Sequence, residues 1–297
     1  MNGKPTRKTA AGRAYLDLRK LASEQGRPTA ELHQLYALEG LLARLPGSEH
    51  SRRFVLKGGV LLAAFDARRP TKDIDLAASG LPNDPESVRV AIAAVLQVET
   101  GDGLTFDVRE MTAETIREGD AYSGVRVSVP CQLATAVVDF HVDVNVGDPI
   151  VPAPETLEIP RLLGGEPIRV LGYPVTMVLA EKIVTALERG PANTRWRDFA
   201  DILTLAEKHS VNAPALQRSL RAVADHRGID TAPLSDSLEG LAEHGRAQWS
   251  AWRRRTGQTA LPEDLADVLG RVCAFADPLL SADGVTGTWS PAASAWE

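Results

Sequence analysis

The sequence predicts an α+β fold, in which a strand-containing half over residues 1–173 is followed by a helical domain over residues 174–280. Strand patterns recur between residues 54 and 172, whereas beyond residue 175 the apolar residues recur with helical spacing. The final stretch, residues 281–297, is rich in Gly, Ser, Pro and Ala, and we expect it to be disordered.

Local signals place the individual elements. Pro46-Gly47 ends a long apolar stripe of helical spacing, and Asn83-Asp84-Pro85-Glu86 has the polar cap and early proline of a helix start. In chain order we expect a polar arm over 1–10, helices over 14–21 and 32–45, a strand over 54–58, a buried helix over 59–65, a strand over 73–77, a helix over 83–97, strands over 104–111, 124–133, 136–147 and 166–172, and then helices over 175–190 and 195–210 that begin a series reaching about residue 275.

Composition narrows the class of protein. A chain of 297 residues with 44% hydrophobic residues can bury a sizeable core, and a net charge of -6 argues against a protein that coats DNA by bulk electrostatics. The two cysteines, Cys131 and Cys273, lie too far apart for a zinc module and indicate a reducing compartment. No apolar run approaches the ~18 residues of a membrane span, so we expect a cytoplasmic protein with no membrane partner.

Two aspartates lie two residues apart in the strand that contains DIDLA. Because side chains alternate along a strand, Asp73 and Asp75 point one way while Ile74 and Leu76 point the other. Two carboxylates on one face repel each other unless a cation lies between them, and Mg²⁺ prefers such hard oxygen ligands. An edge strand with one solvated face would give the same pattern, so the pair alone leaves both interpretations open.

A second strand, VDFHVDVNV, places Asp139, His141, Asp143 and Asn145 on one face. Asp143, central in the strand, is the best candidate for a third carboxylate, whereas a solvated face suffices to explain Asp139 and His141. Three carboxylates from two neighbouring strands can hold two Mg²⁺ ions, which clamp the attacking and leaving oxygens of a phosphoryl displacement.

A glycine pair, Gly58-Gly59, lies at the expected strand-to-helix turn. Without Cβ atoms the backbone can approach a phosphate, and the helix that opens at about Val60 directs its N–H groups toward the anion. A tight turn alone would also explain the pair, but its spacing before Asp73 and Asp75 strengthens the nucleotide-site interpretation.

These motifs resemble a known family. Gly58-Gly59, thirteen intervening residues and then Asp73-Ile74-Asp75-Leu76 resemble the signature of the nucleotidyltransferase superfamily with a DNA polymerase β-like fold. More narrowly, LKGG, RRPTKDIDL, VDVNVGDP, LAEKIVTALERG and RDFADIL, in this order over roughly residues 50–210, resemble the AbiEii/MenT nucleotidyltransferase toxins of bacterial toxin–antitoxin systems. The resemblance implies a mixed-sheet nucleotidyltransferase domain followed by a helical bundle, an NTP substrate, two Mg²⁺ ions and a cognate antitoxin protein.

The resemblance also assigns residues. It implies that Asp73, Asp75 and Asp143 are the metal-binding carboxylates, and that Lys182 and Asp198 are the further catalytic residues. Asp201 is the alternative to Asp198 for the acidic position. The expected nucleotide-binding residues are Lys57, Gly58, Gly59, Arg69, Thr71, Lys182 and Arg189. Many superfamily members carry Gly-Ser where this chain has Gly58-Gly59, which leaves the choice of nucleotide open.

The residues by themselves say less about Lys182 and Arg189. They lie on one edge of an otherwise apolar helix, and without the resemblance we would interpret both as solvated. With it, Lys182 is expected to contact the triphosphate and neutralise charge on the leaving group.

The acceptor is the least determined part of the sequence prediction. Several members of the family are known to modify the 3′ end of tRNA and so block translation. Basic and aromatic residues that could contact such an end also fit a plain interpretation, in which the tryptophans pack and the arginines are solvated; they are Arg218, Arg221, Arg227, Trp249, Trp252, Arg253, Arg254 and Arg255. Two alternatives remain, a protein-modifying AMPylase-like enzyme and an NTP-binding pseudoenzyme that acts through protein contacts. The intact carboxylates and Lys182 count against the pseudoenzyme.

Overall fold

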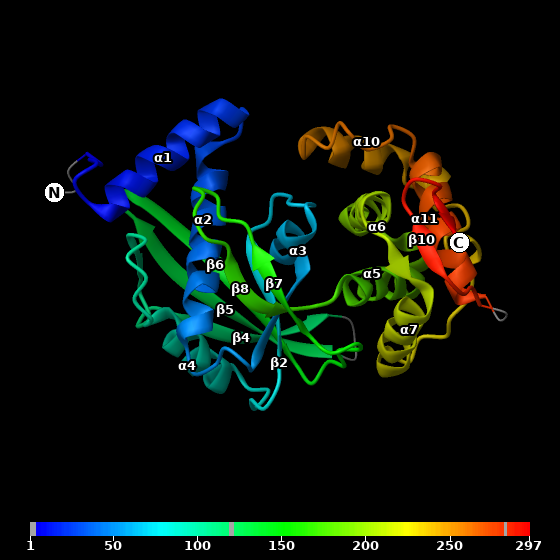
Figure 1. Ribbon diagram of the computed structural model, residues 1–297, viewed down its shortest axis with the longest axis horizontal. Coiled ribbons are helices and arrows are strands. Elements are labelled where there is room, and N and C mark those ends of the chain that lie inside the picture. The colour runs from blue at the N-terminus through cyan, green and yellow to red at the C-terminus, as the bar shows by residue number, and fades with distance from the viewer. Residues whose placement is uncertain (1–3, 119–121, 282–283) are drawn as a thin grey trace. The chain divides into compact units, whose positions relative to one another are not determined.

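The computed structural model describes residues 4–118, 122–281 and 284–297 and divides into two compact units (Figure 1). Unit 1 comprises residues 1–148 and 154–172, and unit 2 comprises residues 149–153 and 173–297. The division falls between Gly172 and Tyr173, one residue before the boundary expected from the sequence, and the short segment 149–153 joins the second unit rather than the first.

Unit 1 is built on a mixed eight-stranded sheet with the strand order β3-β5-β6-β2-β1-β8-β7 and with β4 paired to β5. Its strands are β1 (Phe54–Lys57), β2 (Asp73–Ala78), β3 (Leu104–Phe106), β4 (Thr112–Glu118), β5 (Tyr122–Leu133), β6 (Ala136–Val146), β7 (Glu155–Ile159) and β8 (Ile168–Gly172). The pairs β2–β6 and β1–β8 are parallel, and the other pairs are antiparallel. The α+β class and the mixed sheet expected from the sequence are confirmed.

Helices cover the apolar face of this sheet. They are α1 (Ala10–Gln25), α2 (Thr29–Arg44), α3 (Gly58–Leu61) and α4 (Pro85–Leu96), with short 3₁₀ turns η1 (Leu45–Gly47) and η2 (Leu62–Phe65). Helix α2 packs against β6 (Figure 1). Its Arg44 lies 4.7 Å from the ring centre of Phe106, and the ring of Phe106 packs against that of Phe140 in β6. Since Phe140 shares its face with Val142 and Val144, the opposite face of β6 is the one that carries Asp143.

In unit 1 the sequence patterns missed two strands and overextended a third. Strands β4 and β7 lie at edges of the sheet, where a strand needs no continuous apolar pattern, and TAETIRE and ETLEI have none. The expected strand over 104–111 ends at Phe106. The single buried helix expected over 59–65 is divided into α3 and η2.

Unit 2 is mainly helical, as expected. Its elements are α5 (Val175–Arg189), η3 (Gly190–Ala192), α6 (Trp196–Lys208), β9 (Val211–Asn212), α7 (Ala213–Arg227), α8 (Leu234–Ser237), α9 (Leu241–His244), α10 (Arg246–Arg255), α11 (Leu265–Leu280), β10 (Thr288–Ser290) and β11 (Ala295–Trp296). Among the described residues, no helix of either unit is long and apolar enough to cross a membrane.

The expectation of a disordered tail over 281–297 is wrong for residues 284–297. Strand β10 pairs with both β9 and β11, and Trp289 is buried, with its indole N–H donating to the carbonyl of Ala206 at 2.8 Å. The rings of Trp289 and Trp296 both pack against Phe275 of α11. The small residues dominate the composition of this stretch, but the two tryptophans supply the apolar area that orders it.

Candidate active site

The glycine pair forms a tight turn directly against β2. Gly58 has a φ of +68°, and a Cβ atom there would lie 1.9 Å from Oδ2 of Asp75 and 2.7 Å from its Cβ. A Cβ atom on Gly59 would lie 2.9 Å from Oγ1 of Thr71 and 3.2 Å from Nη1 of Arg69. The structure therefore brings five of the predicted site residues together, because the antiparallel pairing of β1 with β2 folds the turn back onto Asp75.

The predicted carboxylates lie side by side on two parallel strands. Asp75 of β2 is in register with Asp143 of β6, and Asp73 is in register with His141. Residues in register on neighbouring strands point to the same face, so the three carboxylates share one face of the sheet. Nδ1 of His141 lies 3.5 Å from Oδ1 of Asp73. All three aspartates are partly exposed.

Arg126, which the sequence analysis did not select, binds the third carboxylate. It lies directly opposite Asp143 on β5, and its Nε and Nη2 donate to the two carboxylate oxygens at 2.8 and 2.7 Å. This two-point hydrogen bonding to Asp143 raises the pKa of the guanidinium. Asp143 is thus held by a cation of the protein itself.

Lys57 is buried, at the end of β1 in register with Asp75. Its Nζ lies 3.0 Å from Oδ2 of Asp148, a second residue that the sequence analysis did not select. The side chains of Lys57 and Asp148 are only 9% and 13% exposed, so the ion pair is largely shielded from water. Lys57 therefore lies next to the glycine turn, and the carboxylate of Asp148 balances its positive charge.

Lys182 of α5 is bound by both of the candidate acidic residues of α6. Its Nζ lies 3.0 Å from Oδ1 of Asp198 and 2.7 Å from Oδ2 of Asp201, and Nε of Arg195 lies 2.6 Å from Oδ2 of Asp198. Burial alone would raise the pKa of Asp198, but the charges and hydrogen bonds of Lys182 and Arg195 outweigh it and hold the pKa far below its usual range. The structure does not favour one aspartate over the other, since both position the lysine.

The predicted residues thus fall into two groups, one in each unit. The glycine turn and the carboxylates belong to unit 1, and the Lys182 cluster belongs to unit 2. Arg189, the last residue of α5, is exposed.

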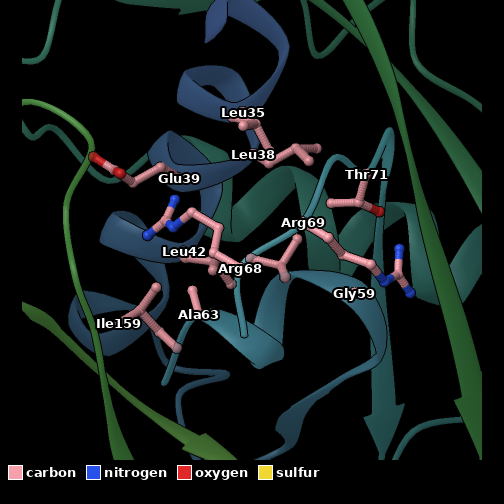
Figure 2. Close-up of a pocket in the computed structure, with 11 residues that line it drawn as sticks. Leu35, Leu38, Glu39, Leu42, Gly59, Ala63, Arg68, Arg69, Thr71 and Ile159 are labelled. Carbon is pink, nitrogen blue, oxygen red and sulfur yellow. The ribbon is translucent and has the colours of Figure 1, made fainter. Parts of the chain in front are cut away.

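A small pocket in unit 1 adjoins the glycine turn (Figure 2). Arg69 and Thr71 line one side, and Glu39 of α2 lies on the other. Oε2 of Glu39 accepts a hydrogen bond of 2.8 Å from the backbone N–H of Leu162, and burial raises the pKa of the Glu39 carboxyl. The remaining lining residues are mostly aliphatic and come from α2, α3, η2, the loop after η2, and β7: Leu35, Leu38, Leu42, Gly59, Val60, Ala63, Arg68 and Ile159. Glu39 therefore ties α2 to the loop after β7 behind the site.

The carboxylates fit Mg²⁺ by donor type and by their shared face. As the side chains stand, no three His, Cys, Asp or Glu residues within 4–118, 122–281 and 284–297 form a group that could hold a metal ion. In the same arrangement both oxygens of Asp143 accept hydrogen bonds from Arg126. Asp73 and Asp75 would be the resident ligands, and Asp143 is the neighbouring carboxylate on the adjacent strand.

This fold, with a glycine turn set against the first carboxylate strand, defines the class of protein as a nucleotidyltransferase. The structure of MenT4, a nucleotidyltransferase toxin from Mycobacterium tuberculosis H37Rv, is similar over 90% of this chain and 91% of that chain, with a TM-score of 0.60 and 21% identity. The structure of JHP933 from Helicobacter pylori is similar over 82% of this chain and 90% of that chain, with a TM-score of 0.50 and 14% identity.

The family follows from the sequence match. The family model described as nucleotidyl transferase AbiEii toxin, type IV TA system, matches residues 40–271, and the chain belongs to this family. It is a nucleotidyltransferase toxin of a type IV toxin–antitoxin system, which implies an NTP substrate and an antitoxin partner. No curated protein matches the chain.

Proposed function

We propose that this toxin transfers a nucleoside monophosphate from an NTP to the 3′ end of tRNA in a Mg²⁺-dependent reaction in the cytoplasm, and so blocks translation. The observation that carries the proposal is the register of Asp75 with Asp143 on parallel strands, with the Gly58 turn packed against Asp75. Around this pair, Asp73, Arg69 and Thr71 complete a polar surface on which a triphosphate and a hydroxyl can meet.

The chemistry is an in-line displacement at the α-phosphorus. The attacking 3′-hydroxyl oxygen forms a bond to this phosphorus, the bond to the bridging oxygen breaks, and pyrophosphate leaves. Asp143 helps to remove the hydroxyl proton. Asp73 and Asp75, together with Asp143, would hold Mg²⁺, which would supply charge neutralisation to the phosphates and so lower the barrier to attack.

The cationic and glycine residues bind the nucleotide in this proposal. Gly58 and Gly59 offer backbone N–H groups to phosphate oxygens next to Lys57, in a turn that only glycine fits, because a Cβ atom at either position would meet Asp75 or Thr71. Lys182, oriented by Asp198 and Asp201, contacts the triphosphate and stabilises charge on the leaving pyrophosphate, with Arg189 as a further contact.

Packing within unit 2 removes three residues of α10 from the set that could contact a tRNA acceptor. Trp249 is buried and donates its indole N–H to the carbonyls of Pro262 and Glu263, and Trp252 stacks on it with ring centres 5.2 Å apart. Arg253 donates to the carbonyls of Leu261 and Thr259. These residues hold the helix in place, and the arginines that remain exposed for contact with RNA phosphates are Arg218, Arg221, Arg254 and Arg255.

The proposal is tested by incubating the protein with labelled NTPs and either total tRNA or cell protein. We expect label on tRNA, loss of this label in Asp73→Ala, and restored growth of cells that express this variant. Asp139→Ala is the matched control, since Asp139 is exposed on the polar face of β6 and should leave transfer unchanged.

Other outcomes would assign a different function. Label on protein that depends on Asp73 would indicate the AMPylase-like alternative, and no Asp73-dependent label on either acceptor would indicate the pseudoenzyme. Full toxicity of Asp73→Ala would contradict the mechanism.

A further inference from the structure

A row of charged side chains crosses five strands of unit 1 in register. From β4 to β1 it consists of Glu114, Arg126, Asp143, Asp75 and Lys57, and each is the direct cross-strand neighbour of the next. Neighbours in register share a face, so the row places one cation at each flank of the central carboxylate pair. The charges of the row therefore alternate except at its centre, where Asp75 and Asp143 adjoin.

Arg126 and a metal ion need the same atoms of Asp143. The guanidinium uses both carboxylate oxygens, at 2.8 and 2.7 Å, and a hard divalent ion would bind through those oxygens as well. Two cations in contact with one carboxylate repel each other. Binding of the ion to Asp143 and the two-point bond to Arg126 therefore oppose each other, since each places a cation on the same two oxygens.

A second carboxylate flanks Arg126 on the neighbouring strand. Glu114 of β4 lies directly opposite it, is exposed, and with Asp143 and Asp73 adds to the negative field that raises the pKa of Arg126. The side chain of Arg126 is 35% exposed, so it has room to change its partner. Leaving Asp143 therefore does not leave the guanidinium without a counter-charge.

We propose that Arg126 is a competitor for the metal position of Asp143, and that a divalent ion enters by displacing the guanidinium from Asp143 toward Glu114. The proposal rests on the metal site of the proposed function. It makes Arg126 a positioning residue that keeps the third carboxylate neutralised while the metal is absent and lowers the affinity of the empty site for the ion.

The test is a titration of the NTP-free protein with Mn²⁺, which stands in for Mg²⁺, with free Mn²⁺ followed by electron paramagnetic resonance. We expect Arg126→Gln to bind Mn²⁺ about fivefold more tightly than wild type, the factor that fits the loss of a partly exposed charge pair. Arg126→Lys keeps the charge but cannot form the two-point bond, and it should show a smaller gain in the same direction. If Arg126→Gln fails to fold, Arg126→Lys still provides the test.

A double-variant cycle separates displacement from simple charge repulsion. In an Asp143→Asn background, Arg126→Gln should leave Mn²⁺ affinity unchanged, because the contested carboxylate is gone. An equal gain in both backgrounds would overturn the proposal. Glu114→Gln should weaken Mn²⁺ binding only when Arg126 is present, and an equal loss without Arg126 would overturn the transfer to Glu114.

Two further variants complete the design. Arg169→Gln removes a cross-strand arginine from its pair with Glu158 on β8 and β7 of the same sheet, and should leave Mn²⁺ affinity unchanged. Asp75→Asn distinguishes a failure of the proposed metal site from a failure of the role of Arg126. If it leaves Mn²⁺ binding intact, the metal site of the proposed function is wrong, whereas if it abolishes binding and Arg126→Gln has no effect, only the role of Arg126 is wrong.

Discussion

At the scale of single residues, Gly58 is constrained twice. Its φ of +68° disfavours any residue with a Cβ atom, and the space that a Cβ would need is occupied by Asp75. Rotation of the Asp75 carboxylate would not relieve the contact, since the Cβ of Asp75 itself would lie 2.7 Å away. Gly80 provides the comparison, because its φ is +67° but, chain neighbours aside, no atom of the described residues lies within 4 Å of the corresponding Cβ position.

We predict that Gly58→Ala lowers the free energy of unfolding by about 3 kcal/mol and abolishes nucleotide transfer, whereas Gly80→Ala costs about 1 kcal/mol and retains transfer. The difference measures the displacement of Asp75 separately from the backbone conformation. Urea unfolding and the tRNA-labelling assay provide the two measurements. Equal effects of the two substitutions would show that the contact with Asp75 does not matter.

Some residues of the site could be predicted from the sequence, and others could not. The glycine pair and the aspartates stand in recognisable motifs, but the contact of Gly58 with Asp75 depends on which strands pair. The pairing of Arg126 with Asp143 follows from the register of the hairpin. A two-residue turn at Ala134-Thr135 pairs residue 133 with 136, and seven residues further along each strand it pairs 126 with 143. This turn lacks the glycine or asparagine that marks a hairpin, and Ala134 adopts a φ of +52°.

At the scale of elements, the C-terminal strands complete the core of unit 2. Trp289 is edge-on to Phe275 with ring centres 4.9 Å apart, and its indole N–H binds the carbonyl of Ala206 in α6. Strand β10 therefore connects α6 with α11, two helices that also contact each other.

We expect Trp289→Ala to destabilise unit 2 by about 4 kcal/mol, because it removes a large buried ring and leaves a cavity. Trp289→Phe keeps much of the ring but loses the hydrogen bond to Ala206, and should cost less, about 2 kcal/mol. Urea unfolding followed by the fluorescence of the remaining tryptophans measures both. An unfolding midpoint of Trp289→Ala equal to that of wild type would show that β10 is not part of the core.

Elements were predictable where burial gives them a pattern. The central strands β2, β5 and β6 and the long helices have apolar residues on a defined face, β1 is a short run buried on both faces, and the sequence placed them well. The edge strands β4 and β7 have no such requirement, and β10 is three residues long. Short or edge strands are specified by their partners, which a single sequence does not reveal.

At the scale of the whole molecule, the two units differ in the probes they carry. All five tryptophans, at positions 196, 249, 252, 289 and 296, belong to unit 2. Tryptophan fluorescence therefore follows the unfolding of unit 2 alone, which matters because a chain of two compact units need not unfold in one step.

We predict that acid weakens unit 2 through Asp198. Its pKa is lower in the folded chain than the ~3.9 of an unfolded aspartate, so the stabilisation is fully present above that value and is lost as the pH falls toward the folded pKa. The loss between pH 5 and pH 2 should be on the order of 2 kcal/mol.

Asp198→Asn provides the control for this prediction. It should be less stable than wild type at pH 7, yet show a flatter dependence on pH below 4, when urea unfolding is followed by tryptophan fluorescence. An equally steep acid loss in the variant would assign the effect to other carboxylates.

The charged row across unit 1 also bears on how the sheet assembles. Structural metal sites commonly couple folding to ion binding, and carboxylates brought together without a counter-ion repel one another. Here Arg126 and Lys57 flank the adjoining carboxylates from the neighbouring strands, so the protein supplies its own counterions while it folds. We therefore expect the sheet to fold without the ion, and under the proposed Mg²⁺ dependence a chelator would inhibit transfer without lowering the free energy of unfolding.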